Sequence, residues 1–187
     1  MISNSVFKLS ALALGTVALV ACSNSEKKQI AAESYVDWVD PLIGSGGHGH
    51  VFVGASIPHG MIQLGPNNNK KGWDWCSGYH DSDSTIIGFA HTHLSGTGIA
   101  DLGDILLMPA VSVIDSAGYL PSSAYVSTFL KQEELVTPGF YQVKLHPSGV
   151  NVELTAGKRV GMHRYVYPSD KKAQVVVDLE NSAQSLM

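Results

Sequence analysis

Apolar and polar residues alternate most clearly in the last third of the chain. Four successive segments repeat with a period of two residues: 139–145, 150–156, 159–167 and 173–179. Successive side chains of a strand point to opposite faces of a sheet, so this period predicts four half-buried strands. The side chains predicted to face the core are Tyr141, Val143, Leu145, Val150, Val152, Leu154, Ala156, Val160, Met162, Val166, Ala173, Val175, Val177 and Leu179.

The connections between these segments are short and contain turn residues, as in HPSG, AGK and PSDKK. They leave no room for a crossover helix, so neighbouring strands are expected to pair antiparallel as a meander. The predicted fold is all-β, an antiparallel β-sandwich. Residues 84–95 and 103–114 predict two further strands, and residues 35–44 predict an edge strand ended by Pro41 and Gly44. Only residues 122–135 carry a rough helical stripe.

The first residues have the pattern of an export signal. An apolar run of signal-peptide length follows Lys8 and ends in small residues before Cys22. The tetrapeptide LVAC resembles a bacterial lipobox, which predicts a signal peptide over residues 1–21 and lipidation of Cys22. The alternative is an ordinary cleaved signal that contains a cysteine. Residues 22–34 are polar and fit a tether, which leaves 35–187 as one domain on either the periplasmic or the outer face of the bacterial envelope.

Composition agrees with a single domain and excludes some partners. The chain has 187 residues, of which 44% are hydrophobic, enough for one sizeable core. Removing residues 1–21 takes away Lys8, so 12 − 1 = 11 basic residues face 16 acidic ones, and the formal charge is −5. This balance argues against nucleic acid as a partner. With Cys22 lipidated, only Cys76 remains, and it is expected to be a small, partly buried side chain in a packed loop rather than part of a disulfide.

Three glycine-rich stretches carry the residues that could bind a ligand: 44–50 (GSGGHGH), 72–80 (GWDWCSGYH) and 91–104 (HTHLSGTGIADLGD). A tryptophan face packs against the C–H surface of a pyranose, while a carboxylate or an imidazole binds its hydroxyls. The middle stretch supplies both kinds of group. Of its two tryptophans, Trp73 and Trp75, one is expected to belong to the core and the other to face a ligand.

The histidines allow a second interpretation. His48 and His50, like His91 and His93, are two residues apart, so on extended strands each pair would share a face, as in cupin-like metal enzymes. Cupins place a glutamate soon after such a pair, whereas the first acid after His93 is Asp101. Histidines that bind backbone groups or line a sugar pocket are therefore favoured, and no metal ligand is predicted in this chain.

The long motifs of this chain resemble a known family. Residues 41–66, 72–109, 137–145 and 159–168 are similar to the N-terminal region of the bacterial exo-acting α-mannosidases of glycoside hydrolase family 92. The resemblance covers residues 35–179, nearly all of the mature chain. It implies a β-sandwich packed on a larger (α/α)6 barrel, a calcium ion in the interdomain active site, and inversion at the anomeric carbon.

The same resemblance implies where the chemistry lies. Inversion requires two carboxyl groups, an acid and a base; in the family the barrel supplies both, and it also supplies most calcium ligands. No catalytic residue is therefore expected in this chain. The residues expected to contact a mannose-containing glycan, with α-1,2 linkages as the default, are Trp73, Asp74, Trp75, Cys76, His48 and His93. The chain is expected to be an N-terminal portion without its barrel and inactive alone; the alternative is a free-standing, lipid-anchored carbohydrate-binding module.

Overall fold

The computed structural model describes residues 34–69, 71–111 and 121–181. The predicted signal peptide, Cys22 and nearly all of the tether lie outside the described residues, as do positions 112–114 of the predicted strand 103–114. Among the described residues, no helix is long and apolar enough to cross a membrane. The helical elements are short 3-10 turns: η1 (Tyr35–Trp38), η2 (Trp73–Trp75), η3 (Ser122–Ala124) and η4 (Lys131–Glu133).

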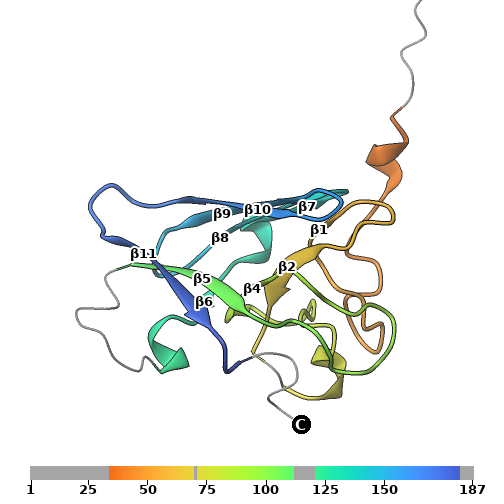
Figure 1. Ribbon diagram of the computed structural model, residues 1–187, viewed down its shortest axis with the longest axis horizontal. Coiled ribbons are helices and arrows are strands. Elements are labelled where there is room, and N and C mark those ends of the chain that lie inside the picture. The colour runs from red at the N-terminus through yellow and green to blue at the C-terminus, as the bar shows by residue number, and fades with distance from the viewer. Residues whose placement is uncertain (1–33, 70, 112–120, 182–187) are drawn as a thin grey trace, which may run out of the picture. The chain divides into compact units, whose positions relative to one another are not determined.

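Two antiparallel sheets face each other across the core, which confirms the predicted all-β sandwich (Figure 1). The five-stranded sheet has the order β1-β2-β4-β5-β11, and the four-stranded sheet the order β10-β9-β8-β7. A small third pair joins β3 to β6. The strands are β1 (Ala55–Ser56), β2 (Gln63–Asn67), β3 (Thr85–Ile86), β4 (Gly88–Ala90), β5 (Leu106–Val111), β6 (Ser127–Thr128), β7 (Glu134–Thr137), β8 (Phe140–Lys144), β9 (Asn151–Ala156), β10 (Gly161–Val166) and β11 (Ala173–Asp178).

The core lies between the two sheets and takes its side chains from alternate strand positions. The inward faces predicted for residues 139–145 and 150–156 are confirmed, since these side chains are almost completely buried. They meet Leu64 of β2, Phe89 of β4 and Met108 of β5, which belong to the same cluster. Burial of this apolar surface is the main force that holds the sheets together.

The faces predicted for β10 and β11 are wrong. Met162 is 63% exposed and Val177 57% exposed, and Val160, Val166, Val175 and Leu179 are exposed with them. The inward side of β10 carries His163 and Tyr165 instead. Both strands lie at the edge of a sheet, and each has large side chains on both faces, so alternation alone did not distinguish the core side from the outer side.

Four other expectations differ from the structure because tertiary pairing overrides local pattern. The meander ends at β10, and β11 crosses to the other sheet, where it pairs antiparallel with β5. Residues 35–44 begin with the exposed turn η1 instead of an edge strand. Residues 122–135 form no α-helix: η3, β6 and η4 follow one another, and β7 begins at Glu134. The predicted strand over 84–95 is divided, since β3 pairs with β6 and β4 pairs with β2 and β5.

Candidate functional site

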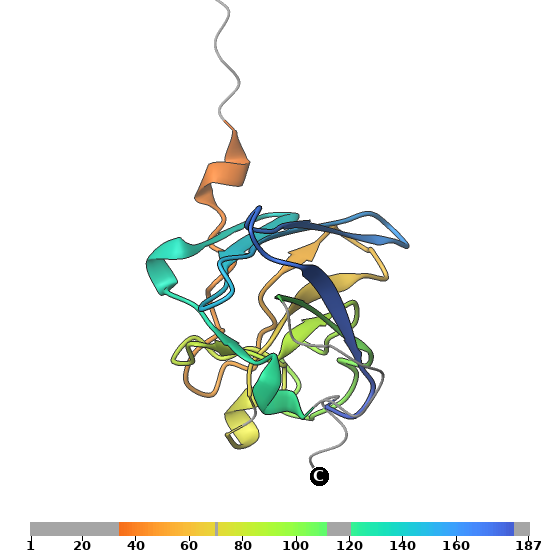
Figure 2. The same cartoon turned by 90° about the vertical axis from the view of Figure 1, so that its left-hand side faces the viewer.

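The three glycine-rich stretches meet on one side of the molecule. Gly96 N–H donates to the carbonyl of His50 at 2.6 Å, and the Ser77 hydroxyl donates to the same carbonyl. Asp81 N–H donates to the Ser45 carbonyl at 2.9 Å. Both views place η2 on the side of the five-stranded sheet that faces away from the four-stranded sheet (Figures 1 and 2). Loops that are far apart in the sequence therefore form one surface.

The stretches 44–50, 72–80 and 91–104 are called the first, second and third loops. Asp74 of the second loop lies between two histidines of the first loop. Its Oδ1 atom is 2.7 Å from His48 Nδ1 and 3.2 Å from His50 Nε2. The hydrogen bond with His48 is the largest cause that lowers the pKa of Asp74 below its ordinary value, and His50 adds to it. His50 is buried and His48 is exposed. The carboxylate therefore stays ionised and links the first loop to the second.

Trp73 is the exposed aromatic ring of the site, with 60% of its surface accessible. His50 contacts its edge at a centroid distance of 4.1 Å, and the indole Nε1 donates to the Gly98 carbonyl at 2.6 Å. Gly98 has φ +66°, and a Cβ atom there would lie 2.9 Å from the indole ring. Glycine is thus required at this position. The first and third loops hold the ring in place, while more than half of its surface stays exposed.

Trp75 is held within the loop rather than presented outside. Its ring is half-buried and stacks on His80 at 4.3 Å, and its Nε1 donates to Asp83 Oδ2 at 2.9 Å. Lys71 Nζ lies 2.9 Å from the same oxygen, and the side chain of Asp83 is fully buried. The two tryptophans therefore differ in burial, but Trp75 packs within the loop and is not part of the hydrophobic core. Cys76 is also buried and forms no disulfide, so it lies beneath the loop surface.

His93 is buried below the loops. Its Nδ1 donates to the Gln63 carbonyl at 2.7 Å, and its Nε2 is 2.6 Å from the Asn67 side chain. Burial lowers the pKa of His93 to about 4, with a smaller contribution from His91, so the ring is neutral at pH 7. Only one nitrogen of a neutral imidazole can donate, so the Asn67 amide group is expected to turn its NH2 toward Nε2. His93 thus supports the site from behind.

The four histidines of the cupin-like alternative do not form a single cluster, as a shared metal site would require. His48 and His50 share Asp74, His91 contacts His163, and His93 is bonded to Gln63 and Asn67. In the part of the chain that the structure describes, no group of three or more His, Cys, Asp or Glu residues could hold a metal ion.

A buried carboxylate that the sequence did not single out anchors the second loop. Glu134 of β7 accepts hydrogen bonds from the Tyr79 hydroxyl at 2.9 Å and the Tyr141 hydroxyl at 2.8 Å. Burial, followed by the charge of Glu134, raises the pKa of both tyrosines. Lys131 donates to the Tyr79 hydroxyl and lies over its ring. Tyr79 lies in the glycine-rich stretch 72–80, but nothing in the sequence pairs it with an acid 55 positions away.

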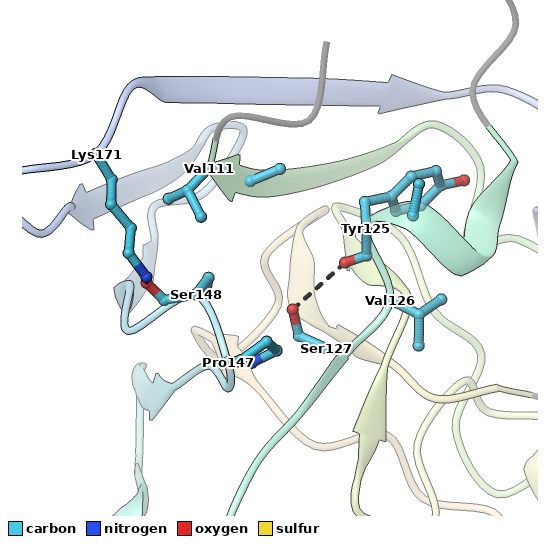
Figure 3. A pocket seen from close by; sticks show the side chains of 9 residues that line it. Val111, Tyr125, Val126, Ser127, Pro147, Ser148 and Lys171 are labelled. Atoms are coloured by element: carbon cyan, nitrogen blue, oxygen red, sulfur yellow. Dashed lines mark hydrogen bonds between the residues drawn. The ribbon is translucent and has the colours of Figure 1, made fainter.

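A separate hollow of about 270 Å³ lies near β5 and β6 (Figure 3). Val111, Tyr125, Ser127 and Lys171 are among its lining residues, and Lys171 Nζ donates to the Ser148 carbonyl at 3.2 Å. None of the candidate residues from the three loops lines it.

Comparison with known proteins gives one consistent result. Residues 38–186 match the sequence model of the Glycosyl hydrolase family 92 N-terminal domain. An α-mannosidase of this family from Bacteroides thetaiotaomicron, solved in complex with mannoimidazole, is 38% identical, with a TM-score of 0.74 over 81% of this chain and 20% of the other. An inverting mannosidase of the family from the same organism is 29% identical, with a TM-score of 0.63 over 77% of this chain and 19% of the other.

A curated relative gives a similar picture. An uncharacterized secreted glycosidase of Arthroderma benhamiae is 27% identical over 164 residues, which are 79% of this chain and 20% of that protein. The chain therefore spans about a fifth of the length of the relatives that it matches.

Proposed function

This chain belongs to the family of the glycosyl hydrolase family 92 N-terminal domain, and on that premise we propose that it is the N-terminal portion of an inverting exo-α-mannosidase. The substrates are mannose-containing glycans, with α-1,2 linkages as the first to test. Both catalytic carboxyl groups come from the remainder of the protein, an (α/α)6 barrel. In this proposal the N-terminal domain contributes one wall of the sugar pocket.

The exposed ring of Trp73 is the observation that carries the proposal. Most of its surface is exposed, His48 lies beside it at a centroid distance of 5.8 Å, and Asp74 is hydrogen-bonded to His48. Aromatic stacking beside hydrogen-bonding groups is the usual chemistry of sugar recognition. Trp75, Cys76 and His93 then act mainly by holding the loop, because all three are partly or fully buried. A structurally similar α-mannosidase, solved in complex with mannoimidazole, supports the choice of sugar.

Calcium does not fit the described residues of this chain. The ion takes six to eight oxygen ligands, chiefly carboxylates and carbonyls. Asp74, the carboxylate of the site, is bound by two imidazoles, and the described residues contain no cluster of three acids or histidines suited to a metal. We therefore propose that most calcium ligands belong to the remainder of the protein, and we assign the ion no step here.

The proposal includes a location. Residues 1–21 act as an export signal, Cys22 carries the lipid that anchors the protein to the bacterial envelope, residues 22–34 are the tether, and residues 35–187 are the N-terminal domain. The secreted glycosidase among the relatives supports export. Labelling intact cells with radioactive palmitate tests lipidation, since Cys22→Ala must lose the label if the proposal is correct.

Mannoside binding by the tryptophan loop is the decisive test. Tryptophan fluorescence of the 187-residue chain and of the longer enzyme is titrated with methyl α-mannoside and α-1,2-mannobiose. Trp73→Ala should abolish the response of both proteins, because it removes the stacking surface. The matched control is Trp38→Ala, which removes another exposed tryptophan outside the three loops. Equal responses of wild type and Trp73→Ala would refute the proposed role of this ring.

A free-standing carbohydrate-binding module is the second candidate. It is supported by the fact that all three loops of the site belong to this chain and contact one another. It requires that the 187-residue chain bind mannosides as tightly as the longer enzyme does. Much weaker binding by the short chain favours the enzyme portion instead.

A further inference from the structure

A pair of histidines joins the two sheets at a place separate from the loop site. His91 follows β4 of the five-stranded sheet, and His163 lies within β10, at the edge of the four-stranded sheet. Their Nε2 atoms are 3.3 Å apart. Both residues are half-buried, so an ion with bound water could reach these nitrogens. Nothing in the proposed mannosidase function uses this pair.

The distance between the nitrogens suits two ligands of one metal ion. Zinc binds imidazole nitrogen at about 2.0–2.1 Å in tetrahedral sites, which separates two such nitrogens by about 3.3–3.4 Å. In a straight N–H···N hydrogen bond, both ring centroids would lie on the line through the two nitrogens. The distance between the centroids would then exceed the distance between the nitrogens by a full ring width. The observed excess is 4.8 − 3.3 = 1.5 Å, which is less than a ring width. The rings are therefore inclined to the line between their nitrogens.

The surroundings fix both rings. The Tyr165 hydroxyl is 2.7 Å from His163 Nδ1, the nitrogen that would face away from an ion. A metal-bound histidine usually donates this second N–H to an oxygen, and a phenol oxygen can accept as well as donate. Gly161 makes room on the other side, because a Cβ atom there would lie 2.9 Å from His91 Nε2.

We propose that His91 and His163 form a binding site for a divalent transition-metal ion of the class that prefers imidazole, with Zn²⁺ as the reference ion. Water completes the coordination, and Tyr165 is the residue that orients His163. An ion bound here cross-links β10 to the loop after β4. It stabilises the folded state by RT ln(1 + c/Kd), where c is the free ion concentration and Kd its dissociation constant.

Metal titration of the 187-residue chain tests the site. The metal-free protein competes with a chromogenic chelator for Zn²⁺, and Co²⁺ reports geometry through its absorption spectrum. We expect one Zn²⁺ per chain, a higher Tm with zinc, and the intense bands of tetrahedral Co²⁺. His91→Gln and His163→Gln should each weaken binding at least about tenfold, and Tyr165→Phe by about tenfold.

Two control variants separate this site from the other histidines. His146→Gln changes a histidine that is bonded to Glu133, and a His48→Gln, His50→Gln double variant changes the pair beside Asp74; neither should alter the affinity. If His163→Gln does not fold, Tyr165→Phe and the Co²⁺ spectrum decide. Three results would overturn the proposal and leave the pair as a hydrogen bond between the sheets. They are the absence of stoichiometric zinc binding, an unchanged zinc affinity in the His91 and Tyr165 variants, and a loss of zinc affinity in the His48, His50 double variant alone.

Discussion

Asp83 is the residue on which the position of Trp75 depends. Its Oδ2 faces Trp75 Nε1 and Lys71, while Oδ1 accepts from the backbone N–H of Ser84 at 2.7 Å and from Thr85. Burial alone would raise the pKa of Asp83, but the hydrogen bonds from Lys71, Thr85 and Trp75 outweigh it, and the pKa is lowered. The charged form is therefore the one that the fold stabilises.

Asp83→Asn should lower the free energy of unfolding by about 1–3 kcal/mol, the typical value of hydrogen bonds to a charged group. The pKa of Asp83 in the folded chain lies below its value of about 3.9 in the unfolded chain. The contribution of Asp83 to stability is therefore complete above the unfolded pKa, and it is lost as the pH falls through the folded pKa. The variant should therefore lose less stability in acid than wild type. Urea unfolding at pH 7 and pH 3 measures both effects, with Asp170→Asn at an exposed position as the control. If wild type and Asp83→Asn lose the same stability between pH 7 and pH 3, Asp83 does not have the proposed role.

His93 should make the domain sensitive to mild acid. Its pKa is lowered to about 4 by burial, whereas an unfolded histidine titrates near 6.5. As the pH falls, His93 thus takes up a proton in the unfolded chain before it does so in the folded chain. Its contribution to stability is complete above about pH 6.5 and is lost as the pH falls toward 4. His93→Gln should be less stable at pH 7 but lose less between pH 7 and pH 5. His59→Asn, at an exposed position, should keep the wild-type slope; if His93→Gln keeps it too, His93 is not the group responsible.

At the scale of elements, the sequence predicted strands better than it predicted their faces. Residues 151–156 alternate an apolar inner row with polar outer residues, and residues 140–144 do so apart from the outer Phe140, so their inner face could be identified. In β10 the inner His163 and Tyr165 compete with the outer Met162 and Val166, which lie on either side of Arg164, and period two cannot choose between the two faces. The strand β2 was missed because QLGPN contains glycine and proline, residues that are rare in strands.

Partner residues of the site were equally hard to predict. The clustering of candidate side chains on the second loop was visible, because aromatic and polar residues crowd a stretch without periodicity. The contacts of Trp73 with Gly98, of Tyr79 with Glu134, and of His91 with His163 were not. These pairs are 25, 55 and 72 positions apart, and only the pairing of strands brings them together.

The faces of β9 and β10 can be checked by mutation. Leu154→Ala removes a side chain that is 1% exposed and should cost about 2–5 kcal/mol of unfolding free energy. Met162→Ala, at a position that is 63% exposed, should change it by less than about 0.5 kcal/mol. Guanidinium unfolding of both variants measures the difference. A large loss in Met162→Ala would restore the inward face that the sequence pattern predicted for β10.

At the scale of the whole molecule, the exposed apolar side chains of β10 and β11 bear on how the chain behaves alone. Met162 of β10 is exposed, and so are Val175 and Val177, which share one face of β11. Neighbouring exposed apolar side chains such as this last pair mark interaction surfaces or cause self-association. Since the chain matches only about a fifth of each relative's length, much of the relatives' mass has no counterpart in it.

The 187-residue chain by itself should therefore self-associate and release no mannose from α-mannosides. Inverting hydrolysis needs an acid and a base on opposite sides of the scissile bond, and in the proposal both come from the remainder of the enzyme. Light scattering and a mannose-release assay on the purified chain test the two expectations. A Val175→Thr, Val177→Thr double variant keeps strand-forming residues while removing apolar surface, so it should stay monomeric at higher concentration with unchanged mannoside binding. Mannose release that follows the chain through purification, and is lost in Trp73→Ala, would instead make this domain an enzyme in its own right.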